Sequence, residues 1–475
     1  MKRSSAFCLF LILIAVACAI NPVTGRRELA LISEQGEIEM GKETDAGIAR
    51  EYGYYNDPEL AKYVTSVGMS LVPHTHRPGL EYHFAVLDTP VVNAFAAPGG
   101  YVYVTRGILA LMSSESELAA VLGHELGHVS ARHTVKMMST QILVQLGLAV
   151  GSVLSEKFAR IAGVAGIGAQ LLFLKFSRDD ERQADALGVQ YARAAQFNSG
   201  EMVRFFTSLQ RYGDMGEGHS VPGFLSTHPL TGERIQNVKA LLGENDVAFP
   251  VRRDVYLNHI DDIVYGDDPR QGFIEGNVFY HPAMGFLFDV PRGWKIENTP
   301  AQVTMATEKG DAAIVLRAEQ SRDDLRTFAQ RKAAAIEGRQ FVAEQSGRVN
   351  GMGAFHQIYN IAQQDQDTLR ARLSFIQKNG YIYSFSQLSK AVDFNRYDGL
   401  FQSVVDSFNG LSDPRYLSRQ PRKLRVIKAD GRRGLKDYLA QSDIKKEGWP
   451  YLAIMNELID AEAIPPLNQL IKVIR

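Results

Sequence analysis

The chain has 475 residues, with 52 Lys and Arg against 53 Asp and Glu and a formal net charge of −1. A surface that binds nucleic acid needs an excess of basic residues to meet the phosphates, so this balance excludes nucleic acid as a main partner. Apolar residues make up 45% and charged residues 22%, which is typical of a globular protein. The length indicates about two to four domains.

The first 17 residues have the order of a secretory signal peptide, with a basic start, an apolar stretch over 7–16 and small residues after it. Ala15-Val16-Ala17-Cys18 resembles a bacterial lipobox, which favours lipidation of Cys18 as the mature N-terminus. Ordinary cleavage after Ala19 is the alternative. Both cysteines, Cys8 and Cys18, lie in this region, so no disulfide framework forms in the body of the protein. We expect an exported protein with a lipid anchor in a membrane.

The first half of the chain is expected to be mostly helical, with short strands. Residues 82–86 and 101–104 have the pattern of strands. Ser114 and Glu117 form a capping box, which predicts a helix that runs to about residue 131.

The second half is expected to be richer in strands. A polar stretch at 266–269 marks a boundary. Residues 270–412 predict a smaller α/β domain, and residues 420–475 predict a short βααβ module. The predicted fold class is therefore α+β, with a mainly helical domain over residues 18–262 after the signal peptide at 1–17.

Chemistry-bearing residues are concentrated in the capped helix, which contains His124-Glu125-Leu126-Gly127-His128. Residues four apart differ by about 40° around a helix, so both imidazoles project from one face, as two ligands of a tetrahedral Zn²⁺ must. Glu125 is rotated by about 100° from His124 and can accept a proton from a zinc-bound water. The sequence predicts one zinc ion per chain, with Glu125 as general base.

A third protein ligand is required, because a catalytic zinc keeps its fourth position for water. His133 lies about 140° around the helix from His128, and we expect it on the surface. Residues 177–185 predict a second helix on which Glu181 and Asp185 share a face. Glu181 is a candidate third ligand, and Asp185 is a candidate acceptor for a ligand histidine's free N–H. An acidic first turn that complements the helix dipole is the alternative.

The two motifs together, His124 to His128 and Ser177-Arg178-x-x-Glu181-x-x-x-Asp185, resemble peptidase family forty-eight of the metallopeptidases, the HtpX- and BepA-like gluzincins. The resemblance covers about residues 21–245, and it includes the segment Asn93 to Gly100. It implies a zincin catalytic domain with Glu181 as third ligand and Asp185 behind the ligand set. The resemblance also implies that the substrates are misfolded or misassembled cell-envelope proteins. It further implies that the protein is a lipoprotein of the bacterial outer membrane that faces the periplasm.

Two further segments are candidate parts of the site. In similar proteins the histidine equivalent to His228 approaches the active site, where it stabilises the oxyanion or occupies the open zinc position in a resting state; helix N-capping is the alternative. Arg234 is expected either to anchor this segment on a carboxylate or to be solvated. Residues 91–104 are expected to supply an edge strand to which an extended peptide adds, with an ordinary core strand as the alternative. The residues expected to contact the peptide are Asn93, Ala94, Phe95 and Ala96.

Two apolar runs, 141–155 and 161–174, are each too short to span a membrane, and we expect a helical hairpin at the cleft rather than membrane contact. Residues 275–410 loosely resemble PsbP- or Mog-like domains, and residues 423–475 resemble a degenerate LysM module. The usual Gly-Asp-Thr of LysM is replaced at 431–434, so peptidoglycan contact and a purely structural role both remain open.

The function predicted from these features is that of a zinc endopeptidase acting on unfolded or misassembled envelope proteins. One alternative is a chaperone-like or peptidoglycan-bound assembly factor with a latent zinc site. A membrane-associated protease that acts through residues 141–174 is the other.

Overall fold

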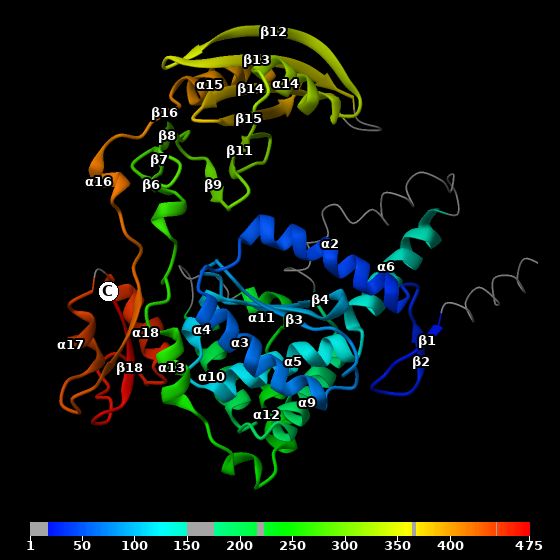
Figure 1. The fold of residues 1–475 in the computed structure, drawn as a ribbon, viewed down its shortest axis with the longest axis vertical. Helices are drawn as coiled ribbons and strands as arrows, with labels where there is room; N and C mark the ends of the chain where they lie inside the picture. The colour runs from blue at the N-terminus through cyan, green and yellow to red at the C-terminus, as the bar shows by residue number, and fades with distance from the viewer. Residues whose placement is uncertain (1–17, 150–174, 216–222, 363–366, 443) are drawn as a thin grey trace, which may run out of the picture. The chain divides into compact units, whose positions relative to one another are not determined.

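The chain folds into two compact units in the computed structural model (Figure 1), which describes residues 18–149, 175–215, 223–362, 367–442 and 444–475. Unit 1 comprises residues 1–267 and 422–475, and unit 2 comprises residues 268–421. The chain therefore leaves unit 1, forms unit 2, and returns. Helices dominate the first part of unit 1 and antiparallel sheets dominate unit 2, which confirms the predicted α+β class.

The first part of unit 1 contains most of the helices. Up to the 150–174 segment, its elements are β1 (Cys18–Ile20), β2 (Arg27–Leu29), α2 (Glu34–Tyr52), α3 (Pro58–Leu71), η1 (Val72–His74), β3 (His83–Leu87), β4 (Ala94–Ala97), η2 (Pro98–Gly100), β5 (Tyr101–Thr105), α4 (Arg106–Leu111), α5 (Glu115–Ser130) and α6 (His133–Ala149). They are followed by α9 (Arg178–Ala194), α10 (Glu201–Gly213), α11 (Gly223–Thr227), α12 (Gly232–Leu241), η3 (Asp246–Ala248) and α13 (Arg253–Ile260). The two strands predicted near residues 82–86 and 101–104 are confirmed as β3 and β5.

Helix α5 is the central helix of unit 1, and every one of its residues is buried. The side chain of Ser114 accepts a hydrogen bond from the amide of Glu117 (3.1 Å), so the predicted N-cap is confirmed. The carboxylate of Glu117 accepts from the amide of Ser113 rather than from that of Ser114, so the second half of the predicted capping box is wrong. The helix nevertheless starts where the sequence indicates.

The largest sheet described in unit 1 has three strands in the order β3-β5-β4. Strand β3 is parallel to β5, and β4 is antiparallel to it. All four residues of β4 are buried, and the strand packs against α5. Among the described residues, one edge of β4 therefore has no neighbouring strand, and the strand lies against the helix that bears His124 and His128.

Residues 422–475 fold as strand, helix, helix and strand, in the predicted order. Their elements are β17 (Leu424–Lys428), α17 (Leu435–Leu439), η5 (Lys446–Gly448), α18 (Trp449–Met455) and β18 (Leu470–Ile474). Strands β17 and β18 are antiparallel, and their apolar side chains belong to the same hydrophobic core as those of α4 and α5. The end of the chain is thus part of the unit that carries the histidine pair.

Unit 2 is built around a seven-stranded antiparallel sheet in the order β12-β13-β14-β15-β11-β10-β9, with a second sheet in the order β16-β8-β7-β6. Its elements are η4 (Pro269–Gln271), β6 (Phe273–Glu275), β7 (Val278–His281), β8 (Phe286–Asp289), β9 (Lys295–Asn298), β10 (Val303–Ala306), β11 (Ala312–Gln320), α14 (Leu325–Ala334), β12 (Arg339–Val349), β13 (Met352–Ile361), β14 (Leu369–Lys378), β15 (Tyr381–Lys390), α15 (Phe394–Asp406), β16 (Asn409–Gly410) and α16 (Pro414–Leu417). Ile382 of β15 packs with α14, whereas Tyr383 packs with α15. Since successive side chains of a strand point to opposite faces, the two helices cover opposite faces of the sheet.

Two segments with predicted roles lie wholly or partly outside the described residues. The leader, residues 1–17, and most of the 141–174 hairpin lie outside the described residues, since α6 is followed only as far as Ala149. Cys18 begins β1 and pairs with Leu29 of β2; its lipidation stays a prediction. Within the described part of the chain, no helix is both long and apolar enough to cross a membrane.

Candidate metal centre

The two histidines of α5 lie one turn apart on the same side of the helix, as their spacing predicts. The Nε2 atoms of His124 and His128 are 3.1 Å apart, and each side chain is only 1% exposed. Burial, together with the neighbouring imidazoles, holds the pKa of His128 well below its ordinary value. The ring is therefore neutral near pH 7, which is the form that binds a metal.

Helix α9 packs against α5 at unusually close range, and two glycines permit this. A Cβ atom on Gly188 would lie 2.9 Å from the amide nitrogen of His124, and one on Gly127 would lie 3.1 Å from the Cα of Ala184. The close crossing brings Glu181, in the first turn of α9, to the two histidines. Its carboxylate oxygens lie 3.7 Å from His124 Nε2 and 3.6 Å from His128 Nε2.

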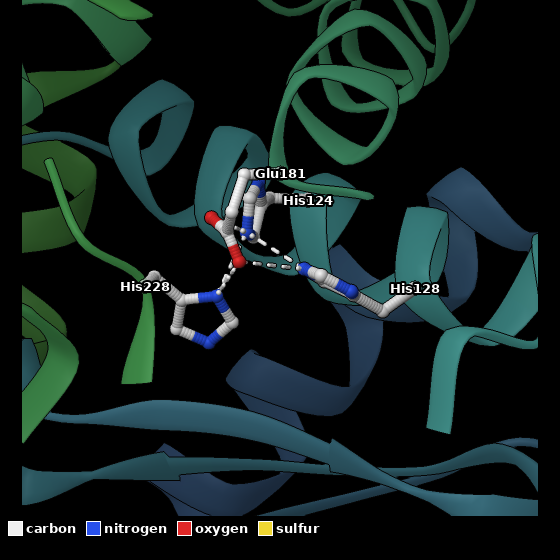
Figure 2. A group of neighbouring side chains, drawn as sticks. All are labelled: His124, His128, Glu181 and His228. Atoms are coloured by element: carbon white, nitrogen blue, oxygen red, sulfur yellow. Dashed lines mark hydrogen bonds and ion pairs between the residues drawn. The ribbon is translucent and has the colours of Figure 1, made fainter. Parts of the chain in front are cut away.

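His228 completes a group of four buried donors. It follows α11, and its Nδ1 lies 2.9 Å from Glu181 Oε1 and 3.3 Å from His124 Nε2. Figure 2 shows the four side chains converging on one point, and one atom from each lies within 4.8 Å of the others. The predicted approach of His228 to the metal-binding histidines is therefore observed.

The spacing of these donors fits zinc. Bonds of about 2.1 Å to a tetrahedral zinc place its ligand atoms about 3.4 Å apart. The five neighbouring pairs of donor atoms described above are 2.9–3.7 Å apart, and one donor atom from each of the four residues lies within 4.8 Å of the others. Three imidazoles and one carboxylate, all buried, are a donor set typical of zinc. Without a cation, burial of this polar group would be unfavourable.

Asp185 and Arg234 lie directly behind the donors. Asp185 Oδ1 is 3.0 Å from His124 Nδ1, and Arg234 binds the same carboxylate through Nε (2.8 Å) and Nη2 (2.7 Å). Burial alone would raise the pKa of Asp185, but the hydrogen bonds from Arg234 and the nearby His124 ring hold it below its usual value. Asp185 is thus an anion that faces the distal nitrogen of His124, and Arg234 makes the carboxylate contact expected of it.

Glu125 lies beside the donors without joining them. It is fully buried, and its Oε1 lies 3.7 Å from His228 Nε2. Neither of its oxygens makes a hydrogen bond of good geometry to a described residue. Burial raises the pKa of Glu125, although His228 and His124 partly oppose the shift. A carboxylate in this environment accepts a proton more readily than one in water.

Strand β4 contains three of the four residues that the sequence assigned to substrate binding. Ala94, Phe95 and Ala96 belong to it, and Asn93 precedes it. The amide of Ala96 is close enough to Glu125 to lower the pKa of that carboxylate, so this side of the strand faces the donors. Asn93 is 2% exposed, and its side-chain oxygen has no hydrogen-bond partner among the described residues.

The expectation that His133 is a surface residue is wrong. It is 1% exposed, and its Nδ1 lies 2.9 Å from the Nδ1 of His128. A helix continued straight from α5 through His133 would place this residue on the surface, but α5 ends at Ser130 and α6 begins at His133. Arg132, with φ of 56°, forms the turn between the two helices. To predict the burial of His133, the sequence would have to show that the helix breaks at residues 131–132. Neither position is a glycine or a proline, so the sequence does not show this break.

The fold and the donors together define a class of protein. Two histidines four apart on one helix, with a glutamate from a second helix, form the metal site of a zinc metallopeptidase. Residues 58–242 match the family described as Peptidase family M48. Mitochondrial metalloendopeptidase OMA1 of Schizosaccharomyces pombe is 30% identical over 233 residues, which are 48% of this chain and 67% of that protein. The chain belongs to peptidase family M48.

Other relatives match the same region. The beta-barrel assembly-enhancing protease of Escherichia coli K12 is 30% identical over 230 residues, 46% of this chain and 46% of that protein. The protein of that name from Yersinia pestis is 31% identical over 228 residues, again 46% of each chain. This chain thus spans about half the length of these curated relatives.

Solved structures resemble other parts of the chain only distantly. The match to cyanobacterial PsbP from Synechocystis covers 28% of this chain and 91% of that protein, with 15% sequence identity and a TM-score of 0.24. The match to Mog1 covers 28% of this chain and 95% of that protein, with 12% sequence identity and a TM-score of 0.22. These scores are too low to assign a fold, so the PsbP- or Mog-like nature of unit 2 stays a prediction.

Proposed function

We propose that the protein is a zinc-dependent endopeptidase that hydrolyses peptide bonds of misfolded or misassembled proteins in the bacterial cell envelope. The observation that carries this proposal is the buried set of His124, His128 and Glu181 with Glu125 beside it. When bound, zinc acidifies a water molecule and polarises the substrate carbonyl. The remaining groups of the reaction come from the chain itself.

Glu125 acts as the general base. It removes the proton from the attacking water and delivers it to the leaving nitrogen, so that its own charge is restored at the end of each cycle. Its buried position supports this role. Burial raises the pKa of the carboxylate towards neutrality, so Glu125 can both accept the proton from water and release it to the leaving nitrogen. Asp185 orients His124 by accepting its distal N–H, and Arg234 holds Asp185 in place.

The substrate is proposed to bind as an added strand along the free edge of β4. Backbone hydrogen bonds hold an extended peptide irrespective of its sequence, which suits an enzyme of unfolded chains. Ala94 and Ala96 are on the same side of the strand, and the proximity of the Ala96 amide to Glu125 supports an orientation towards the site. The side-chain oxygen of Asn93, which is buried and has no hydrogen-bond partner among the described residues, is proposed to accept a hydrogen bond from a substrate amide.

His228 is proposed to be the fourth ligand of a resting state. Its Nδ1 is among the donors at 2.9–3.3 Å, and its side chain is fully buried. A substrate carbonyl needs the position that this nitrogen would take, so the segment that bears His228 must withdraw before hydrolysis. The alternative role, stabilisation of the oxyanion, requires His228 to remain close after it leaves the metal.

The envelope location rests on the predicted signal peptide and lipobox at Cys18, and on the names of the bacterial relatives. The proposed anchoring is by lipid in the outer membrane, facing the periplasm. A peptidoglycan contact through residues 423–475 remains the alternative for that segment.

The decisive experiment compares the wild-type protein with Glu125→Gln. Zinc content per chain and degradation of an unfolded protein such as reduced casein are measured on the same samples. Glu125→Gln should keep about one zinc and lose hydrolysis, because the amide cannot accept a proton. Glu59→Gln, an exposed change on α3, is the matched control and should behave as wild type. Zinc-loaded Glu125→Gln protein that degrades casein at the wild-type rate would exclude the mechanism, and an inactive wild type would favour the assembly-factor alternative.

A further inference from the structure

His133 lies against the side of His128 that faces away from the other donors. The two Nδ1 atoms are 2.9 Å apart, a hydrogen-bond distance. On its other side, the Nε2 of His133 lies 2.9 Å from the side-chain oxygen of Gln183 on α9. His133 therefore connects a histidine of α5 with the helix that carries Glu181, two residues from that carboxylate.

The hydrogen bonds allow one arrangement of protons when His128 binds a metal. His128 directs its Nε2 towards His124 and Glu181, so that nitrogen must keep its lone pair and the ring proton must be on Nδ1. The Nδ1 of His133 must then accept this proton, which leaves the proton of His133 on Nε2. The Nε2–H then donates to the side-chain oxygen of Gln183 (2.9 Å), and the carboxylate of Asp180 lies farther from the same nitrogen, at 3.6 Å.

The backbone between α5 and α6 holds His133 in this place. Arg132 has a left-handed conformation, with φ of 56°, which reverses the chain after Ala131 and brings His133 back towards His128. The side chain of Arg132 is bound at both ends of its guanidinium, by Glu37 Oε2 (2.9 Å) and by the carbonyl of Ile32 (2.9 Å). A conformation that is unfavourable for a residue with a side chain is thus stabilised by two contacts from the N-terminal region.

We propose that His133 is a positioning residue of the metal centre. It fixes the tautomer and ring orientation of His128, and it couples this ligand to α9 through Gln183. The two histidines of the metal site are then held by different groups, since His124 faces the anionic Asp185 and His128 faces a neutral imidazole. The inference rests on zinc binding at this site and is independent of whether the chain is a peptidase.

The test compares two substitutions of His133 by their affinity for zinc. His133→Asn keeps an acceptor close to the position of Nδ1, whereas His133→Phe keeps a ring and removes the acceptor. Zinc affinity is measured on the full chain by competition with a fluorescent chelator, and the unfolding temperature of the zinc-free protein is recorded for each variant. Loss of a group that orients a metal ligand typically weakens binding about 10- to 100-fold. We expect that loss for His133→Phe, with His133→Asn within about threefold of wild type.

Two controls separate positioning from packing. His259, an exposed histidine of the same unit that stacks on Tyr63, is replaced by Phe and should bind zinc as wild type does. Gln183→Leu removes the acceptor for His133 and should weaken zinc binding, whereas Gln183→Glu keeps an acceptor and should not. If His133→Phe does not fold, the comparison of Gln183→Leu with Gln183→Glu tests whether His133 positions His128.

The outcomes are distinct. Wild-type zinc affinity in His133→Phe, or in Gln183→Leu where His133→Phe does not fold, overturns the proposal. Equal losses in His133→Asn and His133→Phe also overturn it, because they show that the ring and not its acceptor is required. The proposal is supported if His133→Asn and Gln183→Glu keep the zinc affinity that His133→Phe and Gln183→Leu lose, while the unfolding temperature of the zinc-free protein is unchanged. Casein degradation is not used as a readout, so failure of the proposed peptidase function leaves this result interpretable.

Discussion

Lys472 Nζ lies 2.7 Å from the carbonyl oxygen of Met112, so the last strand of the chain is tied to the end of α4. The same ammonium also donates to the carbonyls of Ala110 (3.0 Å) and Leu111 (3.1 Å), and Lys472 is fully buried. These carbonyls end a helix and have no partner in the helix itself. A side chain from residue 472 thus completes a turn that leads, within three residues, into α5 and its histidines.

Replacement of Lys472 by Met should destabilise unit 1. It leaves buried carbonyls without a donor, and we expect a loss of about 2–4 kcal/mol in the free energy of unfolding. The chain has two tryptophans, so Trp294→Phe leaves Trp449 of α18 as a reporter of this unit in urea titrations. Lys428→Met, at an exposed position of β17, is the control and should change stability by less than about 0.5 kcal/mol. Equal stabilities of the two variants would contradict the capping role of Lys472.

Asp185→Asn should weaken zinc binding. The amide keeps the size of the side chain but removes the charge that faces His124 Nδ1 and Arg234. Loss of a carboxylate behind a ligand histidine typically costs about 10- to 100-fold in metal affinity. Equilibrium competition with a chelator measures the change, and Asp179→Asn, on the exposed side of the same helix turn, provides the control. Unchanged affinity in Asp185→Asn would show that the contact with His124 does not orient the ligand.

His228→Ala should raise the rate of casein degradation several-fold while it weakens zinc binding. Both effects follow if Nδ1 of His228 is the fourth donor in the closed site, because its removal leaves that position to water and substrate. Activity and zinc affinity are measured together, with His259→Ala as control. A variant that keeps its zinc affinity but loses hydrolysis would instead assign His228 to stabilisation of the oxyanion.

Unit 2 should lose stability between pH 7 and pH 5 because of His281. Burial lowers the pKa of His281 from 6.5 to about 4, and its Nδ1 accepts a hydrogen bond from the amide of Met284 (3.3 Å), which only the neutral ring can do. The folded state therefore binds this proton less readily than the unfolded state. Its contribution is complete above pH 6.5 and is lost as the pH falls through 4, by about 2 kcal/mol between pH 7 and pH 5.

Urea titrations at pH 7 and pH 5 check this sign. Trp449→Phe leaves Trp294 as the reporter of unit 2, and His281→Phe removes the titrating group. We expect the difference in stability between the two pH values to shrink by about 2 kcal/mol in His281→Phe. A difference that persists unchanged would assign the pH dependence to other groups of unit 2.

Local patterns were sufficient for the elements that carry the metal ligands. The spacing of His124 and His128, the N-cap at Ser114 and the acidic turn that contains Glu181 depend on helix geometry over a few residues. Since helix geometry is the same in every context, the structure reproduces these features. The order of strands and helices in residues 422–475 was also predictable, because turn and strand patterns are local.

Two features of the structure depend on contacts between distant segments. The surface position expected for His133 assumed a straight helix, whereas the turn at Arg132 is stabilised by Glu37, almost one hundred residues earlier. The residues after 422 read as a separate module, but their side chains share the core of unit 1 and reach α4 through Lys472. No local propensity encodes either contact.

The amino-acid sequence by itself therefore determined that His124 and His128 share one face of a helix, because periodicity and residue chemistry are sufficient to place two imidazoles there. Only the tertiary structure decided what surrounds them. The close packing at Gly127 and Gly188, the approach of His228 and the placement of His133 behind His128 arise from burial of apolar surface between segments far apart in the chain. The free energy gained by burying apolar surface depends on contacts throughout the core, so these placements form only when the whole core has folded.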